Sequence, residues 1–335
     1  MTGSRTMFVL LLALALVAPN SVLSSSESAA GVEEQVATAG GKPSAGSETG
    51  RGEGFEPEAR ATEGPEIPGT FGPLVTDTAI PIEKGHFAVQ PTFAYSNVLD
   101  AFSPHWGRTS TGGDYQSFGM EWKLTYGLIE NLEVFAVIPY AHNWGEEGGT
   151  SANSGGLGDV NLTLKYRLVE ETVCAPTVTA LFATDFPTGK FKDPNPGDLG
   201  ADLIGGGSYV FTAGFNVSKY IAPFIVYANL WYSMLTSYDD GGPQYPGDFV
   251  TVNLAAEYPI VDKWVALLEL TSYWSGGRVF GPDTNVPHEA LVSVIPAIEY
   301  MATEKFSLAL GLNVDLIGKN ADATIGPIFS MVYAF

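Results

Sequence analysis

Apolar and polar residues alternate along much of this chain. In the stretch GLGDVNLTLKYRL, residues 156–168, every second residue from position 159 is polar and the residues between are apolar. The apolar set is Val160, Leu162, Leu164, Tyr166 and Leu168, and the polar set is Asp159, Asn161, Thr163, Lys165 and Arg167. A period of two residues predicts a β-strand with one apolar and one polar face.

The same alternation recurs after residue 81, in segments of about ten residues separated by turn residues, which is the spacing of strands that cross an outer membrane. We expect twelve strands, at about 86–97, 115–126, 131–141, 158–169, 175–186, 203–217, 223–236, 249–259, 264–275, 290–301, 305–317 and 323–335. Beyond the N-terminal segment, no apolar run reaches the ~20 residues of a membrane helix.

The composition of the two faces indicates which one meets lipid. One face carries large aliphatic and aromatic residues, whereas the other carries small and polar residues with charges in mid-strand. Twelve such apolar faces predict an all-β fold, a transmembrane antiparallel up-and-down β-barrel with lipid outside and a polar lumen. A soluble periplasmic barrel with an apolar interior is the alternative, and it would invert every assignment.

Aromatic residues and loop lengths favour the membrane barrel. One expected rim carries Tyr126, Tyr258, Trp264, Tyr300, Phe306 and Phe335, and the other carries Tyr95, Phe118, Tyr140, Phe186, Tyr232 and Trp274. Two such girdles mark the interfaces of a membrane. Short connections alternate with mostly long ones, as periplasmic turns alternate with extracellular loops. We therefore predict a location in the bacterial outer membrane, in contact with its lipid.

The residues before the barrel fall into two parts. Arg5 precedes the apolar run MFVLLLALALVA, which predicts a signal peptide over residues 1–24. Residues 25–75 are rich in Gly, Ser, Pro and Glu without apolar periodicity, and we expect a disordered acidic periplasmic tail. The barrel is expected over residues 76–335. Whether TFGPLVTDTAIPI, residues 70–82, folds back into the lumen as a plug is left open.

Charge and cysteine content exclude several classes of function. The chain has 37 acidic and 16 basic residues, a formal net charge of -21, which excludes a nucleic-acid partner because such a partner needs a basic surface. Cys174 is the one cysteine, so neither a disulfide framework nor a multi-thiolate metal site can form. We expect no cofactor and no metal.

The end of the chain, IGPIFSMVYAF, resembles the terminal strand of bacterial outer-membrane barrels. Those strands end in Phe after alternating apolar residues, here Tyr333 and Phe335, and this resemblance implies recognition by the barrel assembly machinery. The stretches IEKGHFAVQPTFAY, TYGLIENLEVFAVIPY, GLGDVNLTLKYRL and TDFPTGK resemble the meta-pathway phenol-degradation family of outer-membrane barrel transporters. The resemblance covers roughly residues 76–335 and implies uptake or permeation of a small solute.

The expected lumen is narrow and charged, because twelve strands lie between the filled barrels of eight and the open pores of sixteen or more. Its expected charges are Lys123, Glu133, Lys165, Arg167, Glu257, Glu269, Glu299 and Asp315. The basic residues are expected to face Glu257, Glu269 and Glu299 across the barrel, either as a transverse field around a constriction or as a salt-bridged plug. Glu121, Glu133 and Asp185 are acids on the basic side.

These features predict a passive channel or transporter for small solutes, with aromatic or hydrophobic ones as candidates. The alternative is a closed structural or adhesive barrel whose extracellular loops bind a partner. A hydrolase would need His142 with Ser151 or Ser154, but no orienting acid is evident, so no catalytic residue is expected. The loop residues Asp193, Asn195, Asp198 and Asp202 offer oxygen ligands without the order of a calcium loop.

Overall fold

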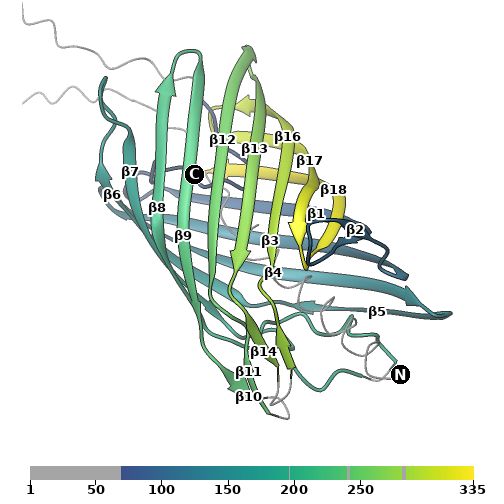
Figure 1. Ribbon diagram of the computed structural model, residues 1–335. Coiled ribbons are helices and arrows are strands. Elements are labelled where there is room, and N and C mark those ends of the chain that lie inside the picture. The colour runs from purple at the N-terminus through teal and green to yellow at the C-terminus, as the bar shows by residue number, and fades with distance from the viewer. Residues whose placement is uncertain (1–68, 196, 240–241, 281–283) are drawn as a thin grey trace, which may run out of the picture.

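The alternating segments form a closed antiparallel barrel (Figure 1). The computed structural model describes residues 69–195, 197–239, 242–280 and 284–335. The predicted signal peptide, and the predicted acidic tail as far as residue 68, lie outside the described residues. In the described part of the chain every regular element is a strand.

Twelve long strands make the wall of the barrel, as the alternation predicts. They are β1 (Phe87–Phe102), β3 (Gly113–Ile129), β4 (Leu132–Glu147), β6 (Val160–Val169), β7 (Thr177–Phe186), β8 (Val210–Ile221), β9 (Phe224–Leu235), β12 (Phe249–Val261), β13 (Trp264–Ser275), β16 (Ala290–Thr303), β17 (Phe306–Lys319) and β18 (Asp322–Ala334). Each pairs with its neighbour in sequence, and β18 pairs with β1, for example Ala334 with Ala88. This last pairing leaves the wall without a free edge.

The described parts of the long connections hold six short strands: β2 (Arg108–Thr109), β5 (Thr150–Leu157), β10 (Tyr238–Asp239), β11 (Pro243–Tyr245), β14 (Arg278–Phe280) and β15 (Thr284–Val286). Strand β5 extends β4 into a tall hairpin. The tip holds Gly148 and Gly149 at φ 60° and 83°, values that favour glycine. Strands β10, β11, β14 and β15 form a separate small sheet.

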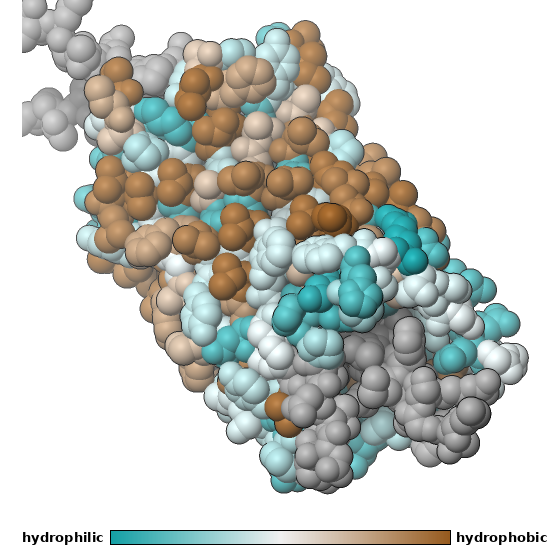
Figure 2. All heavy atoms as spheres, viewed as in Figure 1, coloured by the Kyte–Doolittle hydropathy of each residue, from teal (hydrophilic) through white to brown (hydrophobic). Residues whose placement is uncertain are grey.

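The outer face of the wall is apolar and the inner face is polar. In β6 Leu162, Leu164 and Tyr166 are exposed, whereas Thr163 and Lys165 are buried inside. Figure 2 shows apolar side chains over a broad region of the wall and hydrophilic ones toward the end that holds the small sheet. The predicted barrel with an apolar exterior is therefore confirmed, and the inverted soluble barrel is wrong.

Aromatic side chains meet at both ends of this apolar region. At the end with the short turns, Trp264 lies 4.7 Å from Tyr300 and Phe87 lies 5.7 Å from Phe335, measured between ring centroids. At the other end Phe186 contacts Tyr209 at 6.0 Å. The two girdles place the wall in the bacterial outer membrane, with the short turns on the periplasmic side.

Candidate functional site: the lumen and its internal segment

Residues 70–82, here named the lumenal segment, run inside the barrel. Phe71, Leu74, Val75 and Ile82 are at most 3% exposed. Thr70 binds Glu299 of β16, and Ile82 binds Glu133 of β4, so both ends of the segment lie toward the periplasmic rim. Its middle reaches β8 and β9 deeper in the lumen. The question that the sequence left open is thus answered, because this segment does fold back into the lumen.

A carboxylate of the wall holds the first turn of the segment. The Glu269 side chain accepts hydrogen bonds from the backbone N–H groups of Leu74, Val75 and Thr76, with shortest distances of 2.6, 3.0 and 2.7 Å. The segment has no strand partner, so its backbone donors must find acceptors among the side chains of the wall. Glu269 meets this need for three consecutive residues.

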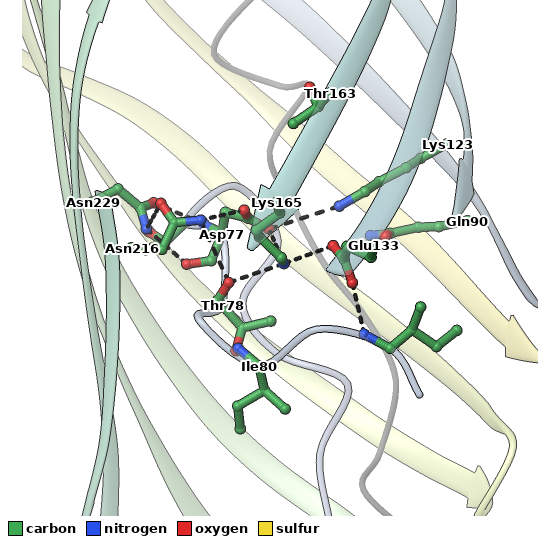
Figure 3. A network of polar contacts seen from close by, with 12 residues as sticks. Asp77, Thr78, Ile80, Gln90, Lys123, Glu133, Thr163, Lys165, Asn216 and Asn229 are labelled. Atoms are coloured by element: carbon green, nitrogen blue, oxygen red, sulfur yellow. Dashed lines mark hydrogen bonds and ion pairs between the residues drawn. The ribbon is translucent and has the colours of Figure 1, made fainter. Parts of the chain in front are cut away.

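Asp77 lies at the centre of a polar network that crosses the lumen (Figure 3). Its carboxylate accepts a hydrogen bond from Asn216 Nδ2 at 2.5 Å. Its backbone exchanges two hydrogen bonds with Asn229, N–H to Oδ1 at 2.8 Å and Nδ2 to C=O at 2.7 Å. On the opposite side, Lys123 Nζ and Lys165 Nζ lie 3.7 and 3.6 Å from Oδ1. Asp77 therefore connects strands β8 and β9 with strands β3 and β6.

The two lysines are neutralised locally. Lys165 Nζ forms an ion pair with Glu133 at 2.8 Å and donates to the Thr78 carbonyl at 3.1 Å. Glu133 also accepts from the Ile82 N–H at 2.6 Å. Because these groups are buried, the pairing is needed to offset the cost of removing their charges from water.

Apolar packing against the wall completes the contacts of the lumenal segment. Leu74 and Val75 pack in a cluster with Ile295, Ala309 and Ile328. Gly311 makes room for this cluster, because a Cβ added there would lie 2.7 Å from the Leu74 side chain. The segment is therefore held both by polar acceptors and by shape.

The remaining predicted lumen charges occupy three different places. Glu299 accepts from Thr70 Oγ1 at 2.8 Å, and Glu257 accepts from the Tyr227 hydroxyl at 3.0 Å. Arg167 is at the periplasmic end, bound to Asn131 at 2.7 Å and to Glu170 at 3.7 Å. Asp315 binds Ser293 and Thr324 near the start of β18.

The predicted opposition of charges across the lumen takes a different form. The basic residues Lys123 and Lys165 are bound to Asp77, and Glu269 and Glu299 are bound to backbone groups of the lumenal segment. Sequence reasoning missed Asp77, Asn216 and Asn229. The asparagines alternate with apolar residues in β8 and β9 and could have been flagged as lumenal, but no pattern indicated that Asp77 would meet them.

A long loop joins β7 to β8 above the lumenal segment, on the extracellular side of the barrel. Beyond Val137 and Asn161 the pairing partner of β4 changes from β6 to β5, starting at Tyr140 and Leu157. Residues 187–195 and 197–209 connect β7 to β8, and the Ala201 carbonyl accepts from the buried Asn143 side chain of β4 at 3.1 Å. Asp159 holds this loop through the N–H groups of Gly189 at 2.9 Å and Gly206 at 2.7 Å. A Cβ on Gly189 would lie 2.7 Å from Gly205 Cα, so the backbones touch.

Within this loop Asp202 binds Lys190 and the Asn195 N–H. Burial raises the pKa of Asp202, but the hydrogen bond and charge of Lys190 and the Asn195 N–H outweigh it and hold the pKa below its ordinary value. Asn195 Nδ2 in turn donates to Asp198 at 2.8 Å. In the described part of the chain, no group of three or more His, Cys, Asp or Glu side chains is placed to hold a metal.

The residues considered for hydrolysis lie on β4 and β5. The His142 ring contacts Trp144 at 4.4 Å, and His142 pairs with Gly155 across the hairpin. Ser154 pairs with Asn143, and Ser151 pairs with Glu146, farther along the same hairpin. Cys174 is exposed in the turn between β6 and β7.

Comparisons with known proteins identify the fold. No family model and no curated protein matches the chain, so the phenol-degradation family stays a prediction. The COG4313 outer membrane channel from Pseudomonas putida F1 is 15% identical, with a TM-score of 0.66 over 76% of this chain and 97% of that chain. The translocator domain of the autotransporter NalP from Neisseria meningitidis is 11% identical, with a TM-score of 0.44 over 76% of this chain and 90% of that one.

A search of the described residues finds no helix long and apolar enough to cross a membrane. The strand order, the apolar exterior and the likeness to the Pseudomonas putida channel agree with one another. The chain has the fold of a bacterial outer-membrane β-barrel of twelve strands.

Proposed function

We propose that this protein is a passive channel for small apolar or aromatic solutes, and that the lumenal segment narrows its axial path. The observation that carries the proposal is that one strandless segment, held by side chains of the wall, occupies the lumen at mid-depth. The segment sets the width of the path. The Pseudomonas putida protein of similar fold, an outer membrane channel, supports this reading.

An apolar solute fits poorly with an axial route past this segment. It would have to pass Asp77, Lys123 and Lys165, and separating these buried charges leaves each one uncompensated. A lateral route avoids the network if the solute leaves the lumen above Asp77.

Residues 187–209 offer a place for such a lateral route. There β7 has ended, and a loop instead of a strand lies beside β5. Side-chain contacts hold this loop, namely Asp159 to Gly189 and Gly206, and Thr188 to Gly158. Paired strands would resist opening more strongly, because their backbone N–H and C=O groups must stay hydrogen-bonded in lipid.

Uptake of an apolar fluorescent naphthylamine into cells with an intact outer membrane tests this proposal. Expression of the protein should raise the uptake rate, and Asp159→Ala should raise it further by loosening the loop. Asp198→Ala, in the same loop but outside the Asp159 contacts, is the matched control. Replacing residues 70–82 by a Gly/Ser linker should increase ion conductance and leave naphthylamine uptake unchanged. Uptake that the protein does not alter would refute the proposal.

A closed structural or adhesive barrel is the second candidate. The network around Asp77 favours it by bridging opposite walls, and the sheet of β10, β11, β14 and β15 gives the long loops a regular surface. Absence of both conductance and uptake in the native protein would support this candidate.

A further inference from the structure

A row of lumenal side chains runs around four neighbouring strands just above the lumenal segment. Glu121 on β3 pairs with Pro139 on β4, Val137 on β4 pairs with Asn161 on β6, and Asn161 pairs with Asp185 on β7. Strand β6 runs toward the periplasm, so this row lies on the extracellular side of Lys165 and Asp77. A solute that enters from outside therefore reaches the row first.

The row contains two acids that the lumenal segment does not use. Asp185 accepts one hydrogen bond, from Asn161 Nδ2 to Oδ1 at 2.7 Å. Glu121 is 5% exposed, and its Oε1 is buried without a hydrogen-bond partner among the described residues. The two carboxylates act on each other electrostatically. A buried acceptor without a partner is costly, so Glu121 Oε1 can accept a hydrogen bond from a bound water or solute.

The neighbouring cation acts on Glu121 through its charge and also contacts other groups. Lys123, two residues from Glu121 on the same face of β3, lies 3.7 Å from Asp77 Oδ1 and 4.0 Å from the centre of the Phe135 ring. Its ammonium group is directed toward the lumenal segment.

A small hollow adjoins the row, lined by Asp185 and Asn161 on one side and by aromatic rings on the other. The rings belong to Phe135, Trp231 and Phe249. The free space is about 30 Å³, which is room for about two water molecules. The hollow can thus accept a small polar head group, but a whole aromatic ring would need more space.

We propose that this hollow binds the primary ammonium group of an organic cation, with Asp185 of its lining as one acceptor, Glu121 of the adjoining row as the second, and the rings as its apolar lining. An ammonium group has three donors and no acceptor, which suits two carboxylates. Aromatic faces attract cations as well. The limited space favours a primary over a quaternary ammonium. This inference rests on the proposed function, since it narrows the solutes of that channel to amines.

Binding to the purified full-length protein in detergent tests the proposal independently of transport. Calorimetry compares benzylammonium with benzyl alcohol, its uncharged analogue, and with benzyltrimethylammonium. Benzylammonium should bind at least tenfold more tightly than either. Glu121→Gln and Asp185→Asn should each weaken it about tenfold or more, as expected when a charged acceptor is lost.

Asp262→Asn is the matched control, because Asp262 is an exposed acid in the turn between β12 and β13 and its change removes the same charge. Heat-dependent gel migration verifies that each variant remains a folded barrel. Equal binding of benzyl alcohol, or unchanged affinity in both lumen variants, would overturn the assignment. Loss of naphthylamine uptake with intact benzylammonium binding would count against the proposed function alone.

Discussion

Replacing Glu269 by glutamine should release the first turn of the lumenal segment. In the native protein one carboxylate accepts the N–H groups of Leu74, Val75 and Thr76. A hydrogen bond to a charged group contributes about 1 kcal/mol more than a neutral one, so three such bonds lose about 3 kcal/mol in the variant. Each 1.4 kcal/mol is a factor of ten, and local opening of these residues should become roughly a hundredfold more frequent.

Amide hydrogen exchange followed by mass spectrometry measures this opening directly. Peptides that contain residues 74–76 should exchange about a hundredfold faster in Glu269→Gln, while the wall strands keep their protection. Asp315→Asn is the control, because Asp315 is also a lumenal acid but binds Ser293 and Thr324. Unchanged exchange at residues 74–76 would refute the assignment of Glu269 as their anchor, and equal acceleration throughout the wall would show that the change acts on the whole barrel.

Three further predictions concern the wall, the loop and the end of the chain. Leu310→Arg should lower the free energy of unfolding in lipid vesicles by roughly 2–4 kcal/mol, and a spin label at 310 should contact lipid while one at Asn313, on the opposite face of β17, should not; the reverse would contradict the topology. The pKa of Asp202 is lowered, so its stabilisation of residues 187–209 is complete above pH ~4 and is lost as the pH falls through the lowered pKa; pepsin should cut this loop faster as the pH drops, and Asp202→Asn should remove that dependence. Deleting Phe335 should reduce the folded band in a cellular assembly assay, and equal amounts with and without it would exclude a signal there.

The wall could be predicted from sequence because lipid and lumen impose opposite demands on adjacent residues. Leu308, Leu310 and Leu312 alternate with small and polar residues, and a one-residue error in register would place every one of them in the lumen. The strands of the long loops were missed because they lie outside lipid and show no such alternation. Strand β5, TSANSGGL, is polar on both faces, so no period of two marks it.

The lumenal segment could be suspected but not positioned. TFGPLVTDTAIPI has two prolines and a glycine and no regular apolar period, so neither a strand nor a helix is expected there. Its place depends on acceptors that lie far away in sequence, such as Glu269, which is 195 residues from Leu74. The sixth long strand was expected from residue 203 but begins at Val210, because residues 201–204 are buried in the loop that covers the wall.

The backbone of the lumenal segment explains several of the acids inside the barrel. Since this segment has no strand partner, its N–H groups require acceptors from the wall. Glu269, Glu299 and Glu133 supply them on β13, β16 and β4. Glu269 and Glu299, which were expected from the sequence to contribute to a field across the lumen, thus bind the backbone of the lumenal segment.

Glu121 and Asp185 are not among these acceptors. Within the described part of the chain, Asp185 is bound to Asn161 of the wall and Glu121 Oε1 has no hydrogen-bond partner. Removing an anchor should loosen residues 70–82, whereas removing either of these two acids should leave those residues protected and change the binding of a cation. Hydrogen exchange and calorimetry on the same set of variants therefore separate the acids that hold the protein together from the acids that hold a solute.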